Sequence, residues 1–426
     1  MQQAAASAAA SAFVVEQQLS LLRGDHPLLH CCGRSIVAAT GARSFDFPGF
    51  SVAAQFRGAT SVKAVLEETG TNRFGVSLDG GSSWLPDTLN TTADQNVYTV
   101  CAGLSPEVTY DLVLLKLTEA CSRVYGCTWG DFGTTKLLQL HLEGRHATAL
   151  APVTPWAHAA ESCAHRDAPT RAHPPAIGGS SPLVPRRLEF IGDSITAGWG
   201  ARSPAAATTD DACNAGEDQR ASWAYQTAGL LHAEAQVIAW GGVGLVQNDD
   251  AGTRPEGASS PVLWRRALAN DPKSMWDATA WLPDAVLLHL GTNDLCCDTP
   301  VATTAFQDAY VAFIGEIVAA RLPRHRATFF LACGPMGNSK GGCDHTGRCD
   351  YFPCSTVERV AAAVNTSGVE AHVLDFGGMM DDEASVGGCR HPSEHAHAKM
   401  ADKAAAALRA AFGWTTPSSA ENKVRL

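Results

Sequence analysis

Hydrophobic and polar positions change their period once along the chain. Between residues 44 and 150 the period is two, as in the alternating run from Phe50 to Phe56, and turn-forming stretches such as Asp79-Gly80-Gly81 separate the runs. Side chains of a strand point alternately to its two faces, so this period predicts strands. Short strands at regular spacing are typical of a sandwich, and we expect a β-sandwich, jelly-roll-like, over 44–150.

After residue 187, short apolar runs alternate with stretches of helical period. The predicted strands are 188–191, 237–240, 285–290, 327–333 and 369–376. The predicted helices are 222–234, 303–321, 355–365 and 393–412. Strands that alternate with helices predict an α/β domain with a doubly wound, parallel, five-stranded sheet. Ligands of such sheets bind at the carboxyl ends of the strands, so chemistry is expected there.

Segments without either period lie outside these two regions. We expect an N-terminal segment at 1–43, the sandwich at 44–150, a linker or insertion at 151–187, the α/β domain at 188–414 and a C-terminal tail at 415–426. The linker is rich in Pro, Ala and Gly and contains His158, His165 and His173. We interpret these histidines as solvated and assign no metal to them, because metal ligands need a fixed geometry.

Composition narrows the possible partners. The 426 residues include 32 basic and 43 acidic side chains, which gives a net charge of −11, and there is no run of Lys or Arg that would neutralise phosphates. We therefore expect no nucleic-acid partner. No stretch reaches the roughly 18 consecutive apolar residues of a membrane span, so we expect no membrane partner.

Cysteine usage favours an oxidising compartment. The chain has 14 cysteines, and two clusters have spacings that could close short disulfide loops, namely Cys121/Cys127 and Cys343/Cys349/Cys354. Asn90 and Asn365 begin glycosylation sequons. The first dozen residues, rich in Ala and Ser, resemble the apolar part of a secretion signal but lack a basic start. We expect a protein that is secreted or lies in the secretory pathway.

One serine stands where a catalytic hydroxyl is useful. The first strand of the α/β region runs into Gly192-Asp193-Ser194-Ile195-Thr196-Ala197-Gly198. Ser194 thus occupies a strand-to-helix turn, where backbone N–H groups point outward and stabilise developing negative charge. Its hydroxyl could act as a nucleophile. An ordinary serine helix cap is the alternative interpretation.

Three further motifs complete the set. Gly241-Gly242-Val243-Gly244 follows the second strand, and glycine lets a backbone N–H approach a substrate oxygen closely. Asn293 follows the third strand, and its amide could donate to an oxyanion or stabilise a turn. His391 comes just before the last helix, where an imidazole could reach Ser194 and act as a general base.

Two groups of residues invite a metal interpretation. Cys343, Asp344 and His345 lie near Cys349 and Cys354, but disulfides are the expected use of these cysteines in an oxidising compartment. His395 and His397 follow His391 on the last helix, where the helical direction sends them to different faces. Zinc stays the alternative for both groups.

The four blocks, in this order, resemble the SGNH (GDSL-type) hydrolases, which are named for a catalytic Ser, Gly, Asn and His. The chain is most similar to carbohydrate esterase family 2, acetylxylan-esterase-like enzymes with a β-sandwich before the SGNH domain. This resemblance implies that the parallel sheet is of the flavodoxin-like type. The residues that carry this likeness are 116–119, 188–191, Trp240 and 276–284. The resemblance covers Phe45 to Phe412, apart from the linker.

Position by position, the resemblance implies Ser194 as nucleophile and His391 as base. It also implies an oxyanion hole formed by the N–H of Ser194, the N–H of Gly242 and the amide of Asn293. Gly242 is chosen because the family's Ser-Gly-Xaa-Gly aligns with Gly241 to Gly244. The scheme needs no cofactor and no metal.

The chain departs from the family pattern beside the histidine. Many SGNH enzymes place an Asp two or three residues before the His, but those positions are Cys389 and Gly388. Some members of the similar family work with a Ser-His dyad, in which a backbone carbonyl holds the imidazole N–H. We predict that arrangement, and the alternative orienting groups are Asp381, Asp382 and Glu383.

The resemblance implies a serine esterase that removes acetyl groups from hydroxyls of polysaccharides or oligosaccharides through an acyl-enzyme on Ser194. The expected partner is an acetylated carbohydrate. Trp199 and Trp240 adjoin the motifs and could stack on sugar rings, with core packing as the alternative for each. Two other functions stay open: a GDSL-type lipase or lysophospholipase, and a carbohydrate-binding protein without catalysis.

Overall fold

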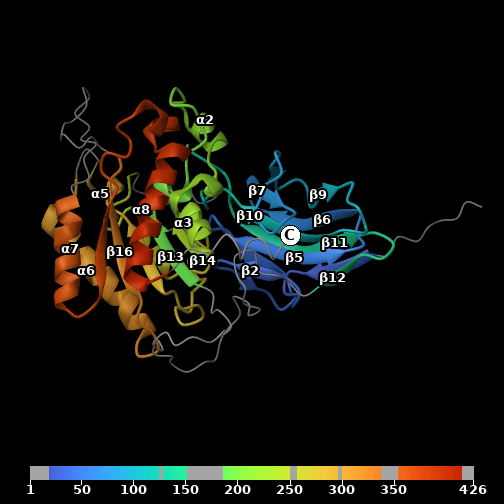
Figure 1. Cartoon of the computed structure of the whole chain (residues 1–426), viewed down its shortest axis with the longest axis horizontal. Coiled ribbons are helices and arrows are strands. Elements are labelled where there is room, and N and C mark those ends of the chain that lie inside the picture. Colours follow the sequence, from blue (N-terminus) through green and yellow to red (C-terminus); the bar gives the residue numbers. More distant parts are fainter. Residues whose placement is uncertain are drawn as a thin grey trace, which may run out of the picture.

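Two antiparallel sheets form the N-terminal domain, drawn in blue and cyan in Figure 1. The computed structural model describes residues 19–123, 127, 129–150, 186–249, 257–295, 300–336 and 354–414. One sheet contains β1 (Leu19–Arg23), β3 (Ile36–Val37), β4 (Arg43–Phe45), β6 (Ser61–Glu68), β9 (Val97–Ala102) and β11 (Thr135–Glu143). The other contains β2 (His30–Cys32), β5 (Ser51–Arg57), β7 (Asn72–Ser77), β8 (Leu89–Thr91), β10 (Thr109–Lys116) and β12 (Thr148–Leu150).

The predicted alternation decides which face of each strand is buried. In β6, Val62, Ala64 and Leu66 are fully buried, and the residues between them are partly exposed. These side chains pack in one core with Phe56 of β5 and Leu114 of β10 from the other sheet. Burying a Val, Leu or Phe side chain contributes about 1.5–3 kcal/mol, so this face-to-face packing holds the sandwich together.

The sandwich begins earlier than predicted. β1 pairs with β11, β2 pairs with β5 and β3 pairs with β4, so the described residues 19–43 belong to the sandwich. The predicted boundary at residue 44 is therefore wrong. These three strands have only five, three and two residues, which is too short for a period to be recognised.

The C-terminal domain is built on the predicted parallel sheet. Its strands are β13 (Arg186–Gly192), β14 (Ala233–Ala239), β15 (Ala285–His289), β16 (Thr328–Cys333) and β17 (Ala371–Asp375). Their order across the sheet is β14-β13-β15-β16-β17, and every neighbouring pair is parallel. This is the flavodoxin-like order, whose switch point lies between β13 and β15. The expected fold class is confirmed.

Helices cover both faces of this sheet (Figure 1). Side chains of α3 (Trp223–Leu231) and α8 (Glu394–Phe412) share one core with the sheet, and those of α6 (Thr303–Arg321) and α7 (Cys354–Thr366) share another. The shorter helices are α1 (Ser194–Ala197), α2 (Asp210–Ala215), α4 (Ser260–Trp264) and α5 (Thr292–Leu295). Within the described ranges, no helix has the length and apolar character that crossing a bilayer requires.

A buried ion cluster joins the two domains. Arg34 of the sandwich domain donates to Glu189 of β13 at 3.1 Å, and Arg321 of α6 donates to the same carboxylate at 2.7 Å. Burial alone would raise the pKa of Glu189, but the guanidiniums of Arg321 and Arg34 outweigh it and hold that pKa below its ordinary value. The first strand of the sheet is thus fixed directly to the sandwich.

A second interdomain contact lies nearer the carboxyl ends of the strands. Arg73 of β7 donates to the backbone carbonyls of Asn214 and Ala215 in α2 and of Glu217 just after it. Three charge-assisted hydrogen bonds from one guanidinium fix the end of α2 against the sandwich. This matters because α2 carries residues that border the candidate site.

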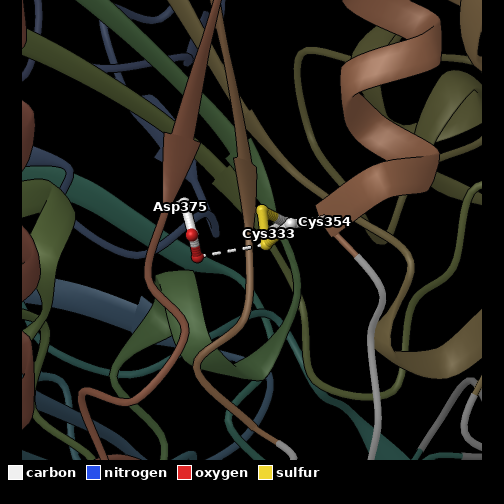
Figure 2. Close-up of side chains that lie close together, drawn as sticks. All are labelled: Cys333, Cys354 and Asp375. Carbon is white, nitrogen blue, oxygen red and sulfur yellow. Dashed lines mark hydrogen bonds between the residues drawn. A yellow bond between two sulfur atoms is a disulfide. The ribbon is translucent and has the colours of Figure 1, made fainter. Parts of the chain in front are cut away.

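Three disulfides occur in the described part of the chain. Cys121–Cys127 is the short loop predicted from the sequence. Cys354 pairs with Cys333, which lies outside the Cys343/Cys349/Cys354 cluster (Figure 2). Cys343 and Cys349 lie outside the described residues. The Cys333–Cys354 disulfide joins the end of β16 to the start of α7. The sequence separation of 21 between the two cysteines is not a spacing that indicates a disulfide. The third disulfide, Cys213–Cys389, was not predicted.

Cys333, Cys354 and Asp375 form the group of metal-type ligands that the described residues bring together, shown in Figure 2. Both cysteine sulfurs are in the disulfide, so neither is available as the thiolate that binds zinc. Of the other residues considered as metal ligands, Asp344, His345 and the linker histidines His158, His165 and His173 lie outside the described ranges.

Candidate active site

The local sequence after β13 places Ser194 at the start of α1. Asp193 is the residue before the helix, and its Oδ1 accepts the N–H of Ile195 at 3.0 Å. Asp193, and not Ser194, is therefore the helix cap, which leaves the Ser194 hydroxyl free for another role. A Cβ on Gly192 would lie only 2.1 Å from Thr196 Oγ1, so the tight turn requires glycine there.

Ser194 and His391 meet, as the sequence predicts. Ser194 Oγ lies 2.7 Å from His391 Nε2, and the two residues are 197 positions apart. His391 Nδ1 lies 3.0 Å from the backbone carbonyl oxygen of Cys389. A carbonyl oxygen only accepts, so the proton of the neutral ring is on Nδ1 and Nε2 is free to accept the serine proton. This geometry suits a hydroxyl nucleophile paired with a base.

A carbonyl takes the place of the usual carboxylate beside His391. Of the alternative orienting groups, Asp382 accepts from Lys399 and Ser385, and Asp381 and Glu383 are exposed. No carboxylate in the described part of the chain is hydrogen-bonded to the His391 ring. The structure thus has the predicted backbone carbonyl, and not a carboxylate, beside His391 Nδ1.

The zinc interpretation of the last helix does not fit the geometry. His395 is exposed, whereas His397 is buried and its Nδ1 accepts the backbone N–H of Trp223 at 3.1 Å. Burial, with His391 and His289 nearby, lowers the pKa of His397 to about 3. The three histidines therefore have separate environments, and His397 acts as a neutral acceptor for α3.

The pH profile follows from the environment of the base. Burial of the ring lowers the pKa of His391 to about 4, and the hydrogen bond to the Cys389 carbonyl opposes this only in part. The imidazole is neutral above its pKa, so we expect kcat/KM for ester hydrolysis to stay high down to about pH 4 and to fall below it. Initial rates between pH 3 and 8 measure this.

A nearby carboxyl group needs a control in that experiment. Burial raises the pKa of Asp193 to about 7, with a smaller contribution from Asp294. The Asp193→Asn variant keeps an oxygen for the Ile195 N–H and removes this titration. An inflection near pH 7 that disappears in this variant comes from Asp193. An acid limb at about pH 6.5 in both proteins would contradict the expected behaviour of His391.

In the glycine loop after β14, Gly241 to Gly244, one backbone N–H is not used in a hydrogen bond within the described residues. The N–H of Gly241 is bonded to the Glu119 carboxylate and that of Gly244 to Asn248 Oδ1 at 3.0 Å. The N–H of Gly242 has no hydrogen-bond partner among the described residues, and its φ of 66° is a conformation that favours glycine. This agrees with the choice of Gly242 for the oxyanion hole.

Asn293 and its neighbour hold that loop. Asn293 Nδ2 donates to the carbonyl of Val243 at 2.8 Å, which uses one of its two amide protons. The carboxylate of Asp294 accepts the backbone N–H groups of Leu245, Val246 and Gln247 at 2.7–3.0 Å. Because β13 lies between β14 and β15, the loop, Ser194 and Asn293 meet at one edge of the sheet.

The two tryptophans have different environments. Trp199 is partly exposed, and its ring stands edge-on to the His391 ring with centroids 4.7 Å apart. Trp240 is fully buried in the core beneath the sheet. A buried indole cannot stack on a sugar, so the prediction for Trp240 is wrong and the one for Trp199 stays open. Adjacency to a motif does not reveal which face of the sheet a side chain occupies.

A series of hydrogen bonds borders the site, and the sequence did not predict it. Trp199 Nε1 donates to Asn214 Oδ1 at 2.6 Å, and the Asn214 amide donates to the Trp129 carbonyl. Trp129 Nε1 in turn donates to Glu119 Oε1 at 2.8 Å, and Glu119 Oε2 accepts the Gly241 N–H. These hydrogen bonds connect Trp199, which contacts His391, to the glycine loop at Gly241 through residues of the N-terminal domain.

A second buried acid, Glu217, lies beside Glu119. Glu217 accepts the backbone N–H of Glu119 at 2.8 Å. Burial, and then the charge of the neighbouring Glu119, raise the pKa of Glu217 well above its ordinary value. The sequence signal was the segment 116–119, whose likeness to the family carried no role for Glu119.

Comparison with known proteins gives consistent matches. A model of the GDSL-like lipase/acylhydrolase family matches residues 190–399, and one of the carbohydrate esterase 2 N-terminal domain matches 31–137. The cellulase/esterase CelE of Acetivibrio thermocellus is 28% identical over 396 residues, 92% of this chain and 40% of that protein. An acetylxylan esterase/glucomannan deacetylase of Cellvibrio japonicus is 34% identical over 113 residues, 26% of this chain and 31% of that one.

Solved structures extend the match to the fold. A family two carbohydrate esterase from Clostridium thermocellum, solved in complex with cellohexaose, has a TM-score of 0.68 and 25% identity, covering 91% of this chain and 100% of that chain. The chain spans less than two thirds of the length of the two curated relatives.

Proposed function

We propose that this chain, a GDSL-type hydrolase with a carbohydrate esterase 2 N-terminal domain, is a serine esterase. In the proposed reaction it removes acetyl groups from sugar hydroxyls of polysaccharides or oligosaccharides. One observation carries the proposal: Ser194 Oγ, His391 Nε2 and the Cys389 carbonyl form a continuous hydrogen-bonded series. We infer an acetyl group and a sugar as the two parts of the substrate from the similarity to the acetylxylan esterase/glucomannan deacetylase.

The geometry gives each residue a role in acyl transfer. Ser194 Oγ attacks the acetyl carbonyl carbon while His391 Nε2 takes the serine proton, and the carbonyl oxygen becomes an oxyanion. The N–H groups of Ser194 and Gly242 and the second amide proton of Asn293 stabilise that charge. The C–O bond to the sugar then breaks, and His391 returns the proton to the sugar oxygen.

Deacylation repeats these steps with water. His391 takes a proton from a water molecule, whose oxygen attacks the acetyl-Ser194 ester. The tetrahedral intermediate collapses to acetate, and Ser194 regains its proton from His391. No metal or organic cofactor is required, since the base, the nucleophile and the oxyanion donors all belong to the chain. Trp199 borders the reacting ester because it contacts the His391 ring.

A substrate comparison tests the proposal. We expect acetate release from acetylated glucomannan or acetylated xylan. We also expect p-nitrophenyl acetate to be cleaved at least about tenfold faster than p-nitrophenyl octanoate, because an enzyme specific for acetyl esters discriminates against longer acyl chains. Acetate assay and absorbance measure the two reactions.

Each alternative function predicts a different outcome. Faster cleavage of the octanoyl ester would support the lipase or lysophospholipase interpretation and contradict ours. Binding of the glycans without release of acetate from any ester would indicate a carbohydrate-binding protein.

We also propose that the protein works in an oxidising environment, in the secretory pathway or outside the cell. Three disulfides in the described residues support this, because such bonds persist where thiols are not kept reduced.

A further inference from the structure

The residue that orients His391 is also part of a disulfide. The Cys389 carbonyl accepts the His391 Nδ1 proton, while the Cys389 side chain is bonded to Cys213 of α2. Cys389 stands two positions before the histidine, where many related hydrolases have an aspartate. The chain therefore replaces a charged side chain with a backbone carbonyl whose own side chain is covalently anchored.

The backbone at this point is in an unfavourable conformation. Cys389 has a φ of 51° and Arg390 a φ of 61°, so two consecutive non-glycine residues are in the left-handed region. Such residues persist only where surrounding contacts hold them. This turn directs the Cys389 carbonyl back toward the imidazole, and relaxing either residue would move the oxygen away.

Backbone hydrogen bonds hold the turn together with the disulfide. The N–H of Cys389 donates to the Ala207 carbonyl at 2.8 Å, and the N–H of Gly388 donates to Gly200 at 3.0 Å. Two more hydrogen bonds close the turn across the Cys389 carbonyl: the N–H of His391 donates to the Gly388 carbonyl at 3.0 Å, and the N–H of Gly387 donates to the His391 carbonyl at 2.7 Å. The disulfide adds a covalent link from Cys213 to the side chain of the residue that bears the orienting carbonyl.

The other end of the disulfide is well anchored. Cys213 is fully buried in α2, and the carbonyls at the end of that helix accept from Arg73 of the sandwich domain. The next residue, Asn214, accepts from Trp199, whose ring lies against His391. One short helix thus supports the imidazole twice, through the Asn214 side chain and through the disulfide.

We propose that the Cys213–Cys389 disulfide is a positioning element for His391, which fixes the carbonyl that orients the base. The inference rests on the proposed function for its kinetic test. Without the disulfide, the turn at 389 and 390 relaxes and the imidazole loses its Nδ1 partner. The step that needs the base slows, while contacts that bind the sugar are unchanged.

The test compares two double variants of the full chain. In Cys213→Ser/Cys389→Ser we expect kcat for acetate release to fall about 10- to 100-fold with KM unchanged within about threefold, because a small misplacement of a catalytic group costs up to about 100-fold. The matched control, Cys333→Ser/Cys354→Ser, removes a disulfide that does not contact His391, and its kcat should stay within about twofold of wild type.

A second double variant distinguishes positioning of His391 by the disulfide from a general effect of the disulfide on stability. Glycine adopts the left-handed conformation without a steric penalty, so Cys213→Ser/Cys389→Gly should recover part of the kcat lost in the double serine variant. A merely stabilising disulfide predicts the opposite: both variants would melt earlier but would keep the wild-type kcat at temperatures well below melting. That result would overturn the proposal.

A spectroscopic measurement makes the outcome independent of catalysis. In wild type, NMR should show a slowly exchanging, hydrogen-bonded His391 Nδ1 proton, which should be lost when the Cys213–Cys389 bond is absent. If the double serine variant does not fold, folded wild-type protein treated with dithiothreitol replaces it in this measurement. Dithiothreitol supplies the two electrons and two protons that convert the Cys213–Cys389 disulfide into two thiols. Alkylation and mass spectrometry identify these thiols. A retained Nδ1 signal in either protein would contradict the inference. If wild type releases no acetate, the proposed function fails while this signal still decides the positioning role.

Discussion

Replacing Ser194 with alanine is expected to lower kcat for acetate release by about 10⁴- to 10⁶-fold, which corresponds to about 5–8 kcal/mol of lost transition-state stabilisation. The oxygen that this variant lacks is the atom 2.7 Å from His391 Nε2, and no acyl-enzyme can form without it. The oxyanion donors stay in place, so a small residual rate by direct attack of water is expected. Acetate release from acetylated glucomannan under saturating substrate measures the effect.

The controls for this experiment separate chemistry from folding. Ser194→Ala removes one buried hydroxyl from the start of α1, and the Asp193 cap is untouched, so the melting temperature should change little. Glycan binding should also persist, because only the nucleophile is lost. Ser82→Ala, which alters an exposed serine in a turn of the sandwich, should behave as wild type. Turnover above about 1% of wild type in Ser194→Ala would rule out the serine mechanism.

The sequence predicts much of this architecture because period is a local property. Strands with alternating or continuous apolar residues and helices such as 303–321 could be located within a few residues, and α6 has the predicted bounds. Short elements carry no period, so β2 and β3 were placed in an N-terminal segment outside the sandwich. The order of the strands across the sheet has no such local signal, and the flavodoxin-like type was implied by the family resemblance.

The candidate site divides in the same way. Ser194, Asn293 and His391 were found because each stands beside a strand end or helix start that the sequence reveals. Glu119 and Trp129 were missed because they come from the other domain, and a contact between distant segments leaves no local pattern. The pairing of Cys213 with Cys389, 176 residues apart, is invisible for the same reason.

Replacing His391 with alanine is expected to lower kcat by about 10⁴- to 10⁶-fold, a loss similar to that of Ser194→Ala. The two side chains act as one unit across a 2.7 Å hydrogen bond, so the serine hydroxyl is a poor nucleophile once the base is removed. The Ser194→Ala/His391→Ala double variant should therefore be no slower than either single variant. Kinetics of the three variants, measured with one acetyl ester, test this non-additivity.

The residual activity of His391→Ala has its own signature. Its rate should lack the acid limb near pH 4, because the group responsible for that limb is gone. His395→Ala provides the matched control: this exposed histidine lies four positions along the chain, in the first turn of α8, and its removal should leave kcat and the pH profile unchanged. A loss of less than about tenfold in His391→Ala, or an equal loss in His395→Ala, would show that the imidazole at 391 is not the base. Multiplicative losses in the double variant would show that the hydroxyl and the ring act independently, contrary to the hydrogen-bonded geometry.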